Sequence, residues 1–190
     1  MKHRFKHICP DPVKLLKGVG KLSTFMNRVE KLSTDPEWLQ NNWTPEEYKG
    51  DALEAFTEVL INLSPIDKRV NIVEYRPHDN KVDGQDLGID GYGLSHNGNL
   101  HTIQVKYRSN TQKDLTANED HISNFVAKTT SSPKFRDADM TIITTAKDLR
   151  QQTKEDMYHD RVRVLGYKEL RKMVDENLPF WDAFRAEMNG

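Results

Sequence analysis

A carboxylate, an amide and an ammonium group lie close to one another in a segment that should form a β-hairpin. Gln104 and Lys106 are two residues apart in LHTIQVKYR, and side chains two apart on a strand emerge on the same face. Asp90 lies in GIDGYG, ahead of HNGN, a strong signal for a hairpin turn. Antiparallel pairing from about Gly88 to Arg108 would bring Asp90 near the face that carries Gln104 and Lys106.

These three groups suit the hydrolysis of a phosphodiester bond. The reaction needs neutralised charge on the scissile phosphate, an activated water molecule and a stabilised leaving oxygen. A Mg²⁺ or Mn²⁺ ion held by carboxylate and carbonyl oxygens supplies much of this. The Lys106 ammonium could orient or deprotonate the water, or bind the phosphate as a point charge.

Each of the three residues also has a purely structural interpretation. Asp90 could cap its own backbone in a glycine-rich turn, Lys106 could be a solvated strand charge, and Gln104 could be a polar residue at a sheet edge. Asp86 and Asp83 lie nearby and could supply the acidic ligand in place of Asp90. The spacing alone is a weak signal, because such triplets arise by chance in many chains.

The elements around the hairpin predict an α/β fold. Thr44-Pro45-Glu46-Glu47 is a good helix start, and its helix should run to about Leu63. Hydrophobic periodicity predicts further strands and helices. The strands are expected at 70–75, 139–145 and 161–165, and the helices at 118–128, 147–158, 167–177 and 179–188. This order predicts a restriction-endonuclease-like mixed central sheet flanked by helices.

The first 43 residues form a separate part of this prediction. Apolar residues recur at helical spacing from Leu15 to Leu32, so we expect an N-terminal helical extension over 1–43 and the main domain over 44–190. The extension could pack on the main domain, bind a partner or dimerise. His3, His7 and Cys9 have the types of metal ligands, but one short cluster without a fourth ligand favours a disordered terminus instead.

Composition is that of a folded protein without a membrane span. Apolar residues make up 36% of the 190 positions and charged residues 30%, which excludes a long disordered chain. Nowhere is there an apolar run near the length of a transmembrane helix, so no membrane partner is expected. A single cysteine fits a reducing compartment, and we expect a cytoplasmic protein.

Net charge gives little indication of a nucleic-acid partner. The formal charge of −1 provides no global positive field, although acidic metal ligands would offset a basic DNA-binding face in the total. Affinity for DNA would then come from phosphate contacts made by individual basic residues. Taken singly, each candidate is better explained as a solvated surface charge; the candidates are Arg108, Lys113, Lys128, Lys134 and Arg136.

Asp90, thirteen intervening residues and then Gln104-Val105-Lys106 form a pattern that resembles the PD-(D/E)XK nuclease superfamily. More narrowly, GIDGYG followed by IQVKYR is similar to the Mrr-like branch, in which Gln takes the place of the usual Glu. That branch also places a Glu on the helix ahead of the sheet, in a context like KGDALEAFTEVL. The corresponding residue is Glu54, with Glu58 as the fallback. The resemblance covers about Lys49 to Leu170.

The resemblance implies a metal-dependent endodeoxyribonuclease of the restriction type. Asp90, the Gln104 side-chain oxygen and the Val105 carbonyl would hold the metal, Glu54 would support a second ion or a bridging water, and Lys106 would act on the attacking water. A homodimer would permit double-strand cleavage, and a separate helicase or other restriction subunit could be a partner. Two alternatives stay open: a structure-specific nuclease acting on Holliday junctions or in repair, and a catalytically silent DNA-binding module of the same fold.

Overall fold

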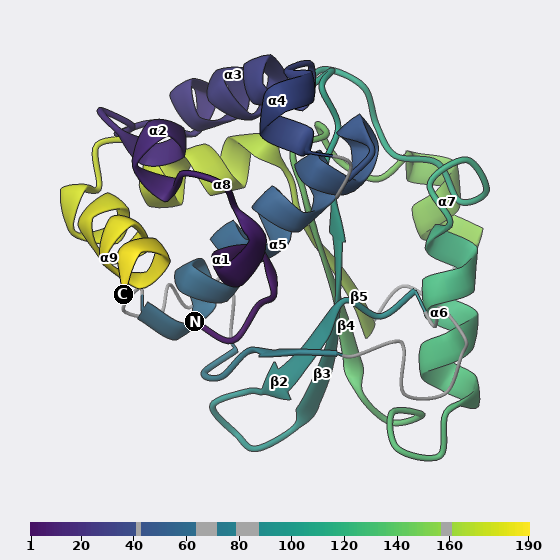
Figure 1. Cartoon of the computed structure of the whole chain (residues 1–190). Helices are drawn as coiled ribbons and strands as arrows, with labels where there is room; N and C mark the ends of the chain where they lie inside the picture. Colours follow the sequence, from purple (N-terminus) through teal and green to yellow (C-terminus); the bar gives the residue numbers. More distant parts are fainter. Residues whose placement is uncertain (41–42, 64–71, 79–87, 157–160) are drawn as a thin grey trace.

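The computed structural model describes residues 1–40, 43–63, 72–78, 88–156 and 161–190 (Figure 1). The helices are α1 (Phe5–Ile8), α2 (Pro12–Leu16), α3 (Leu22–Ser33), α4 (Pro36–Leu39), α5 (Pro45–Leu63), α6 (Ile122–Ser131), α7 (Gln151–Asp156), α8 (Tyr167–Val174) and α9 (Leu178–Asn189). The strands are β1 (Arg76–Pro77), β2 (Gly91–Leu94), β3 (Leu100–Lys106), β4 (Asp139–Thr144) and β5 (Val162–Leu165).

Within the described residues, one sheet contains five strands in the order β1-β2-β3-β4-β5. Strands β1, β2 and β3 pair antiparallel, whereas β3, β4 and β5 pair parallel. Helix α5 and the N- and C-terminal helices cover one face of this sheet, and α6 and α7 lie on the other (Figure 1). The predicted fold class, a mixed central sheet flanked by helices, is therefore confirmed.

The central hairpin forms as its turn residues predict. Gly91 pairs with Ile103 and Leu94 with Leu100, and the turn closes through a hydrogen bond from the Ser95 N–H to the Asn99 carbonyl at 2.8 Å. Gly98 has φ +82°, a left-handed conformation that costs glycine little. The Asn-Gly pair thus fixes the register that places Asp90 beside the middle of β3.

The strand predicted over 70–75 is not found where the structure describes this segment; residues 70 and 71 lie outside the described residues. Residues 72–75 are not in a strand, and β1 begins only at Arg76. The side chain of Asn62 accounts for the difference: its Oδ1 accepts from the Tyr75 N–H at 2.8 Å and its Nδ2 donates to the Tyr75 carbonyl at 3.2 Å. A helix side chain therefore takes the hydrogen bonds that a neighbouring strand would make.

Two predicted helices begin later than expected. Helix α6 begins at Ile122 instead of 118, because His121 has φ +57°, outside the helical region. Helix α7 begins at Gln151 instead of 147, because Leu115 forms a parallel bridge with Leu149 and engages the backbone that the first helical turn would need. A local backbone conformation thus delays the start of α6, and a tertiary contact delays the start of α7.

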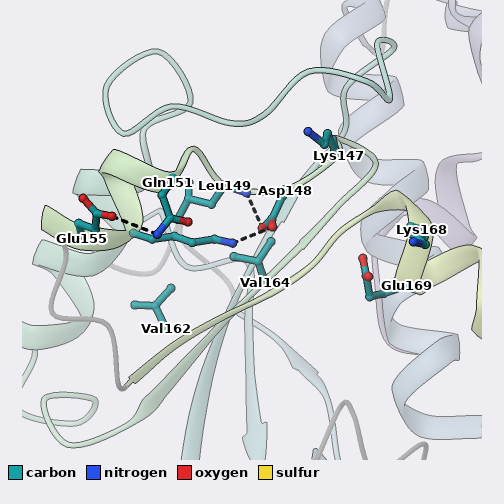
Figure 2. Close-up of a pocket in the computed structure, with 10 residues that line it drawn as sticks. Lys147, Asp148, Leu149, Gln151, Glu155, Val162, Val164, Lys168 and Glu169 are labelled. Atoms are coloured by element: carbon teal, nitrogen blue, oxygen red, sulfur yellow. Dashed lines mark hydrogen bonds and ion pairs between the residues drawn. The ribbon is translucent and has the colours of Figure 1, made fainter.

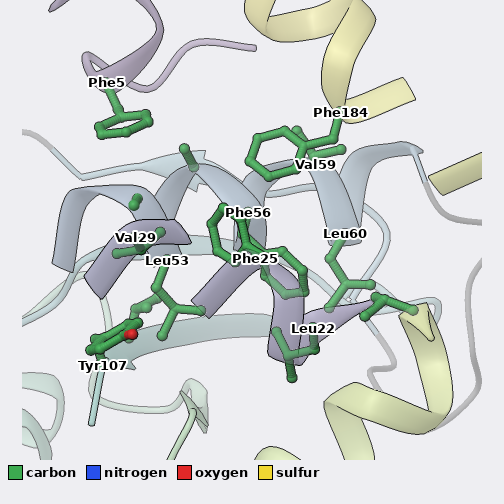
Figure 3. Close-up of a cluster of buried hydrophobic side chains, with 14 of the residues drawn as sticks. Phe5, Leu22, Phe25, Val29, Leu53, Phe56, Val59, Leu60, Tyr107 and Phe184 are labelled. Atoms are coloured by element: carbon green, nitrogen blue, oxygen red, sulfur yellow. The ribbon is translucent and has the colours of Figure 1, made fainter. Parts of the chain in front are cut away.

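The N-terminal helices pack on the main domain. Phe25 of α3 stacks on Phe56 of α5 with ring centroids 5.6 Å apart, and Phe184 of α9 lies 5.8 Å from Phe25. Figure 3 shows these rings meeting between the three helices. Burial of such aromatic surface is the main stabilising contribution on this side of the sheet. The division of the chain at residue 43 stays a prediction.

Both faces of the sheet are covered by apolar clusters. Ile103, Val105 and Ile143 belong to the large cluster under α5, whereas Ile89, Phe125 and Ile142 belong to a smaller one under α6. Within the described part of the chain, no helix combines the length and apolar character needed to cross a bilayer.

Candidate active site

Asp90 immediately precedes β2 and lies beside Ile103 and Val105 of β3. Its Oδ2 accepts a hydrogen bond from the Val105 N–H at 2.6 Å, and its own N–H donates to the Ile103 carbonyl at 3.0 Å. The carboxylate therefore continues the β2–β3 ladder by one step beyond the last backbone pair. This contact fixes the carboxylate in position beside β3.

The Val105 carbonyl points towards the same edge of β3. Amide and carbonyl groups of successive strand residues alternate between the two neighbouring strands. The Lys106 carbonyl faces β4, because it accepts from the Thr144 hydroxyl at 2.7 Å and from the Thr145 N–H. The Val105 carbonyl, one residue earlier, consequently lies on the β2 side with Asp90.

Gln104 is almost completely buried, with 1% of its surface exposed. It pairs with Ile142 on the α6 side, and an added Cβ on Gly88 would lie 3.7 Å from its Nε2. Among the described residues its Oε1 has no hydrogen-bond partner. Leaving a buried amide oxygen unpaired costs about 1–3 kcal/mol. A cation or a hydrogen-bond donor from another molecule would recover this free energy.

Lys106 is the last residue of β3 and is half-buried. It pairs with Thr144 at the carboxyl end of β4 and shares the α6 face with Gln104, as the two-residue spacing predicts. Val105, between them, turns into the cluster under α5. Gln104 and Lys106 thus share one face, but that face is covered by α6 at Gln104 and opens towards the end of the sheet at Lys106.

Glu54 lies on helix α5. The side chain of Tyr75 interacts both with Glu54 of this helix and with Asp90 of the hairpin. The Tyr75 hydroxyl donates to the Asp90 carbonyl at 3.3 Å. Burial raises the pKa of this phenol well above its ordinary value, and the negative charges of Glu54, Asp90 and Glu58 raise it further. Carboxylates from α5 and from the hairpin therefore lie around one hydroxyl group.

Gly91 makes room for this tyrosine. A Cβ at Gly91 would lie 2.3 Å from the Tyr75 ring, so any larger residue would push the ring away from Asp90. The sequence alone did not single out Tyr75, since its position depends on Asn62 and Gly91, which are distant in sequence.

Three other acidic residues are candidates for the site: Asp83, Asp86 and Glu58. Asp83 and Asp86 lie outside the described residues. Glu58, the fallback for Glu54, is buried and accepts hydrogen bonds from the backbone N–H groups of Lys2 and His3. Two backbone donors already satisfy this carboxylate, which leaves Glu54 as the better-placed carboxylate on α5.

The basic residues predicted to contact DNA occupy separate segments on the α6 side of the sheet. Arg108 pairs with Asp120, its Nε 2.7 Å from Oδ1, so its charge is partly neutralised. Lys134 lies over the Tyr92 ring, 4.0 Å from the centroid. Lys128 is half-buried, and Lys113 and Arg136 are exposed. Their contact with DNA stays a prediction.

A pocket of about 750 Å³ lies along β5, with residues of α7 and α8 in its lining and Asp90 absent from it (Figure 2). Its charged lining residues are Lys147, Asp148, Lys154, Glu155, Lys168 and Glu169. Lys154 Nζ lies 2.7 Å from Asp148 Oδ2, and the three bases and three acids balance in charge. Such a lining does not favour an anionic backbone, and we do not assign the phosphate site to it.

The N-terminus is ordered against α5, so the expectation of a disordered terminus is wrong. His3 is buried against Glu54, with Nε2 2.7 Å from Oε2, and Asp51 lies close enough that one ligand atom of each residue falls within 4.8 Å of the others. His7 is exposed and Cys9 is buried elsewhere in the core. The histidine and cysteine pattern therefore does not form the cluster that their sequence spacing suggested.

Burial of Cys9 leads to a prediction about its reactivity. Removal from water raises the pKa of this thiol to about 12, so at pH 8 about one thiol in ten thousand is ionised. We expect iodoacetamide to alkylate the folded protein at pH 8 far more slowly than free cysteine, with the rate restored in urea. Mass spectrometry over time measures this, and rapid native labelling would contradict the burial.

The hairpin, its buried amide and the flanking helices define the class of protein: a restriction-endonuclease-like domain of the PD-(D/E)XK type. A family model for Mrr-type catalytic domains, described as a restriction endonuclease, matches residues 66–185. This match covers more than half of the chain, and the chain therefore belongs to that restriction endonuclease family. The predicted resemblance is confirmed.

A solved structure, the ATP-dependent Type ISP restriction-modification enzyme LlaBIII bound to DNA, is similar over 71% of this chain, with 20% identity and a TM-score of 0.46. The aligned part makes up 8% of that enzyme's chain. Curated proteins gave no match.

Proposed function

We propose that the chain is a divalent-metal-dependent endonuclease that hydrolyses DNA phosphodiester bonds in a restriction-like manner. Membership of the restriction endonuclease family supports a nuclease role. The observation that carries the finer proposal is the bond between Asp90 Oδ2 and the Val105 N–H. This bond supports the proposal because it joins a carboxylate to the QxK strand, close to the Val105 carbonyl.

The donor set at this edge fits Mg²⁺ or Mn²⁺. Hard divalent cations take carboxylate and carbonyl oxygens, and Asp90, the Val105 carbonyl and Gln104 Oε1 are all oxygen donors. The buried Gln104 Oε1 gives the strongest support for a bound cation. Its removal from water is not offset by a hydrogen bond to any described residue. When bound, the ion supplies charge neutralisation at the scissile phosphate.

The remaining residues have distinct roles in this proposal. Lys106, at the end of β3, binds the phosphate as a point charge or orients the attacking water. Glu54 supports a second ion or a bridging water from the α5 side. Asp90 lies between the helix that carries Glu54 and the strand that carries Lys106. Its carboxylate would hold the ion around which these two residues act.

Binding of DNA would use the basic residues on the separate segments described above. Arg108, Lys113, Lys128, Lys134 and Arg136 are the candidates for phosphate contacts, which supply affinity without sequence readout. Cleavage of both strands by a domain of this size requires two active sites, so we propose a homodimer. A separate helicase or other restriction subunit is a further proposed partner.

The deciding experiment is a cleavage assay on supercoiled, linear, branched and single-stranded DNA with Mg²⁺, Mn²⁺ or EDTA. We expect nicking or linearisation of duplex DNA that requires the metal and stops with EDTA. Cleavage confined to branched DNA would instead indicate a structure-specific nuclease. Binding without cleavage under any metal would indicate a silent DNA-binding module and would overturn the proposal.

A further inference from the structure

The N-terminal residues lie along a row of acidic side chains on α5. Asp51, Glu54 and Glu58 follow one another at three- and four-residue steps, so they share one side of the helix. His3 Nε2 lies 2.7 Å from Glu54 Oε2, and the His3 backbone N–H donates to Glu58 Oε2 at 2.7 Å. Helix α1 rests against α5 in Figure 1. Residues far apart in sequence thus meet directly at the carboxylate that the proposed function uses.

The hydrogen bonds of the His3 ring fix where its proton lies. Nδ1 accepts from the Phe5 backbone N–H at 3.1 Å, so this nitrogen presents its lone pair. The proton of the neutral ring is then on Nε2, which donates it to Glu54. The ring is 4% exposed, so solvent competes weakly for this hydrogen bond.

The same geometry argues against a metal ion held by His3, Asp51 and Glu54. A metal on Nε2 would require the ring proton on Nδ1, where it would face the Phe5 N–H. Asp51 is also occupied: its Oδ2 accepts from the Trp43 indole at 2.7 Å, and its Oδ1 accepts from Arg4 at 3.0 Å. This cluster is a hydrogen-bonded support for the α5 carboxylates.

We propose that His3 is a positioning residue for the active site, which holds the Glu54 carboxylate in the orientation that metal-dependent cleavage needs. The inference rests on the proposed function, in which Glu54 supports an ion or a bridging water. Carboxylates that serve metal sites are oriented by such donors, and removal of one typically costs about 10- to 100-fold in metal affinity or activity. The His3 bond uses one Glu54 oxygen and leaves the other for this role.

The attachment of the segment does not depend on the imidazole. Phe5 is fully buried, and its ring centroid lies 5.7 Å from that of Tyr48 and 5.9 Å from that of Trp43. The Glu58 contacts come from the backbone and survive a change of side chain. Replacement of His3 should therefore leave α1 docked while it releases Glu54.

A double-mutant cycle tests the proposal. We expect His3→Ala to raise the Mg²⁺ or Mn²⁺ concentration for half-maximal cleavage by about tenfold or more, and His3→Gln, which keeps an N–H donor, to restore much of the loss. In the Glu54→Gln background, His3→Ala should have no further effect, because His3 acts through Glu54. His7→Ala is the matched control: this histidine is exposed on α1, and its loss should change nothing.

Imidazole NMR and the cleavage assay together separate this proposal from the proposed function. Nitrogen-15 NMR of the imidazole should show the Nε2–H form of His3 in the wild type and a perturbed Nε2 signal in Glu54→Gln, whether or not the protein cleaves DNA. An Nδ1–H ring, wild-type metal dependence in His3→Ala, or additive losses in the double mutant would overturn the positioning role. Inactivity of the wild type with every metal, beside an intact Nε2–H signal, would instead overturn the proposed function.

Discussion

Replacement of Asp90 by alanine should lower the rate of DNA cleavage by roughly a thousandfold or more while the protein stays folded. In the proposed function the carboxylate is the acidic ligand of the metal, so its loss would remove several kcal/mol of stabilisation from the charged transition state. The fold should tolerate the change, because Asp90 is half-buried just before β2 and a water molecule can accept the hydrogen bond from the Val105 N–H. Initial rates at saturating metal measure the effect.

Asp182→Asn provides a matched control for the loss of one carboxylate. Asp182 lies on α9, with 72% of its side chain exposed, far along the chain from the hairpin. Its replacement should leave the cleavage rate unchanged. Undiminished cleavage by Asp90→Ala, at a melting temperature close to that of the wild type, would remove Asp90 from the proposed site.

Local sequence signals predict the hairpin because its determinants are local. Gly98 accepts the left-handed conformation of the turn, and the alternation in β3 then determines which side chains share a face. Once the turn is placed, the register that brings Asp90 beside Val105 follows by counting residues. The D…QxK relationship could therefore be read from the sequence, together with the family that it indicates.

The rest of the site could not be read in this way, because it depends on contacts between distant segments. The Tyr75 backbone bonds the side chain of Asn62 instead of continuing a strand, and its ring fills the space left by Gly91. His3 reaches Glu54 from 51 residues away. Neither contact produces a periodic pattern in the sequence, because each depends on a single residue of the right type at a single position.

The N-terminal helices illustrate the same point for the fold. Their amphipathic pattern predicts helices with one apolar side but does not say what covers that side. In the structure α5 and α9 cover that side. The N-terminal extension therefore stabilises α5, the helix that carries Glu54. The extension and the proposed active site therefore share one hydrophobic core, and damage to that core should affect both.

Phe56→Ala should lower the free energy of unfolding by about 3–5 kcal/mol, the cost of removing a buried phenylalanine and leaving a cavity. Phe56 is fully buried on α5, with its ring centroid 5.6 Å from that of Phe25 and 5.1 Å from that of Phe180. A domain with about 5–15 kcal/mol in total would be left close to unfolding. Urea denaturation measures the change, and Leu178→Ala, at a position 61% exposed on α9, should cost little by comparison. A loss below about 1 kcal/mol for Phe56→Ala would mean that α3, α5 and α9 do not share the core.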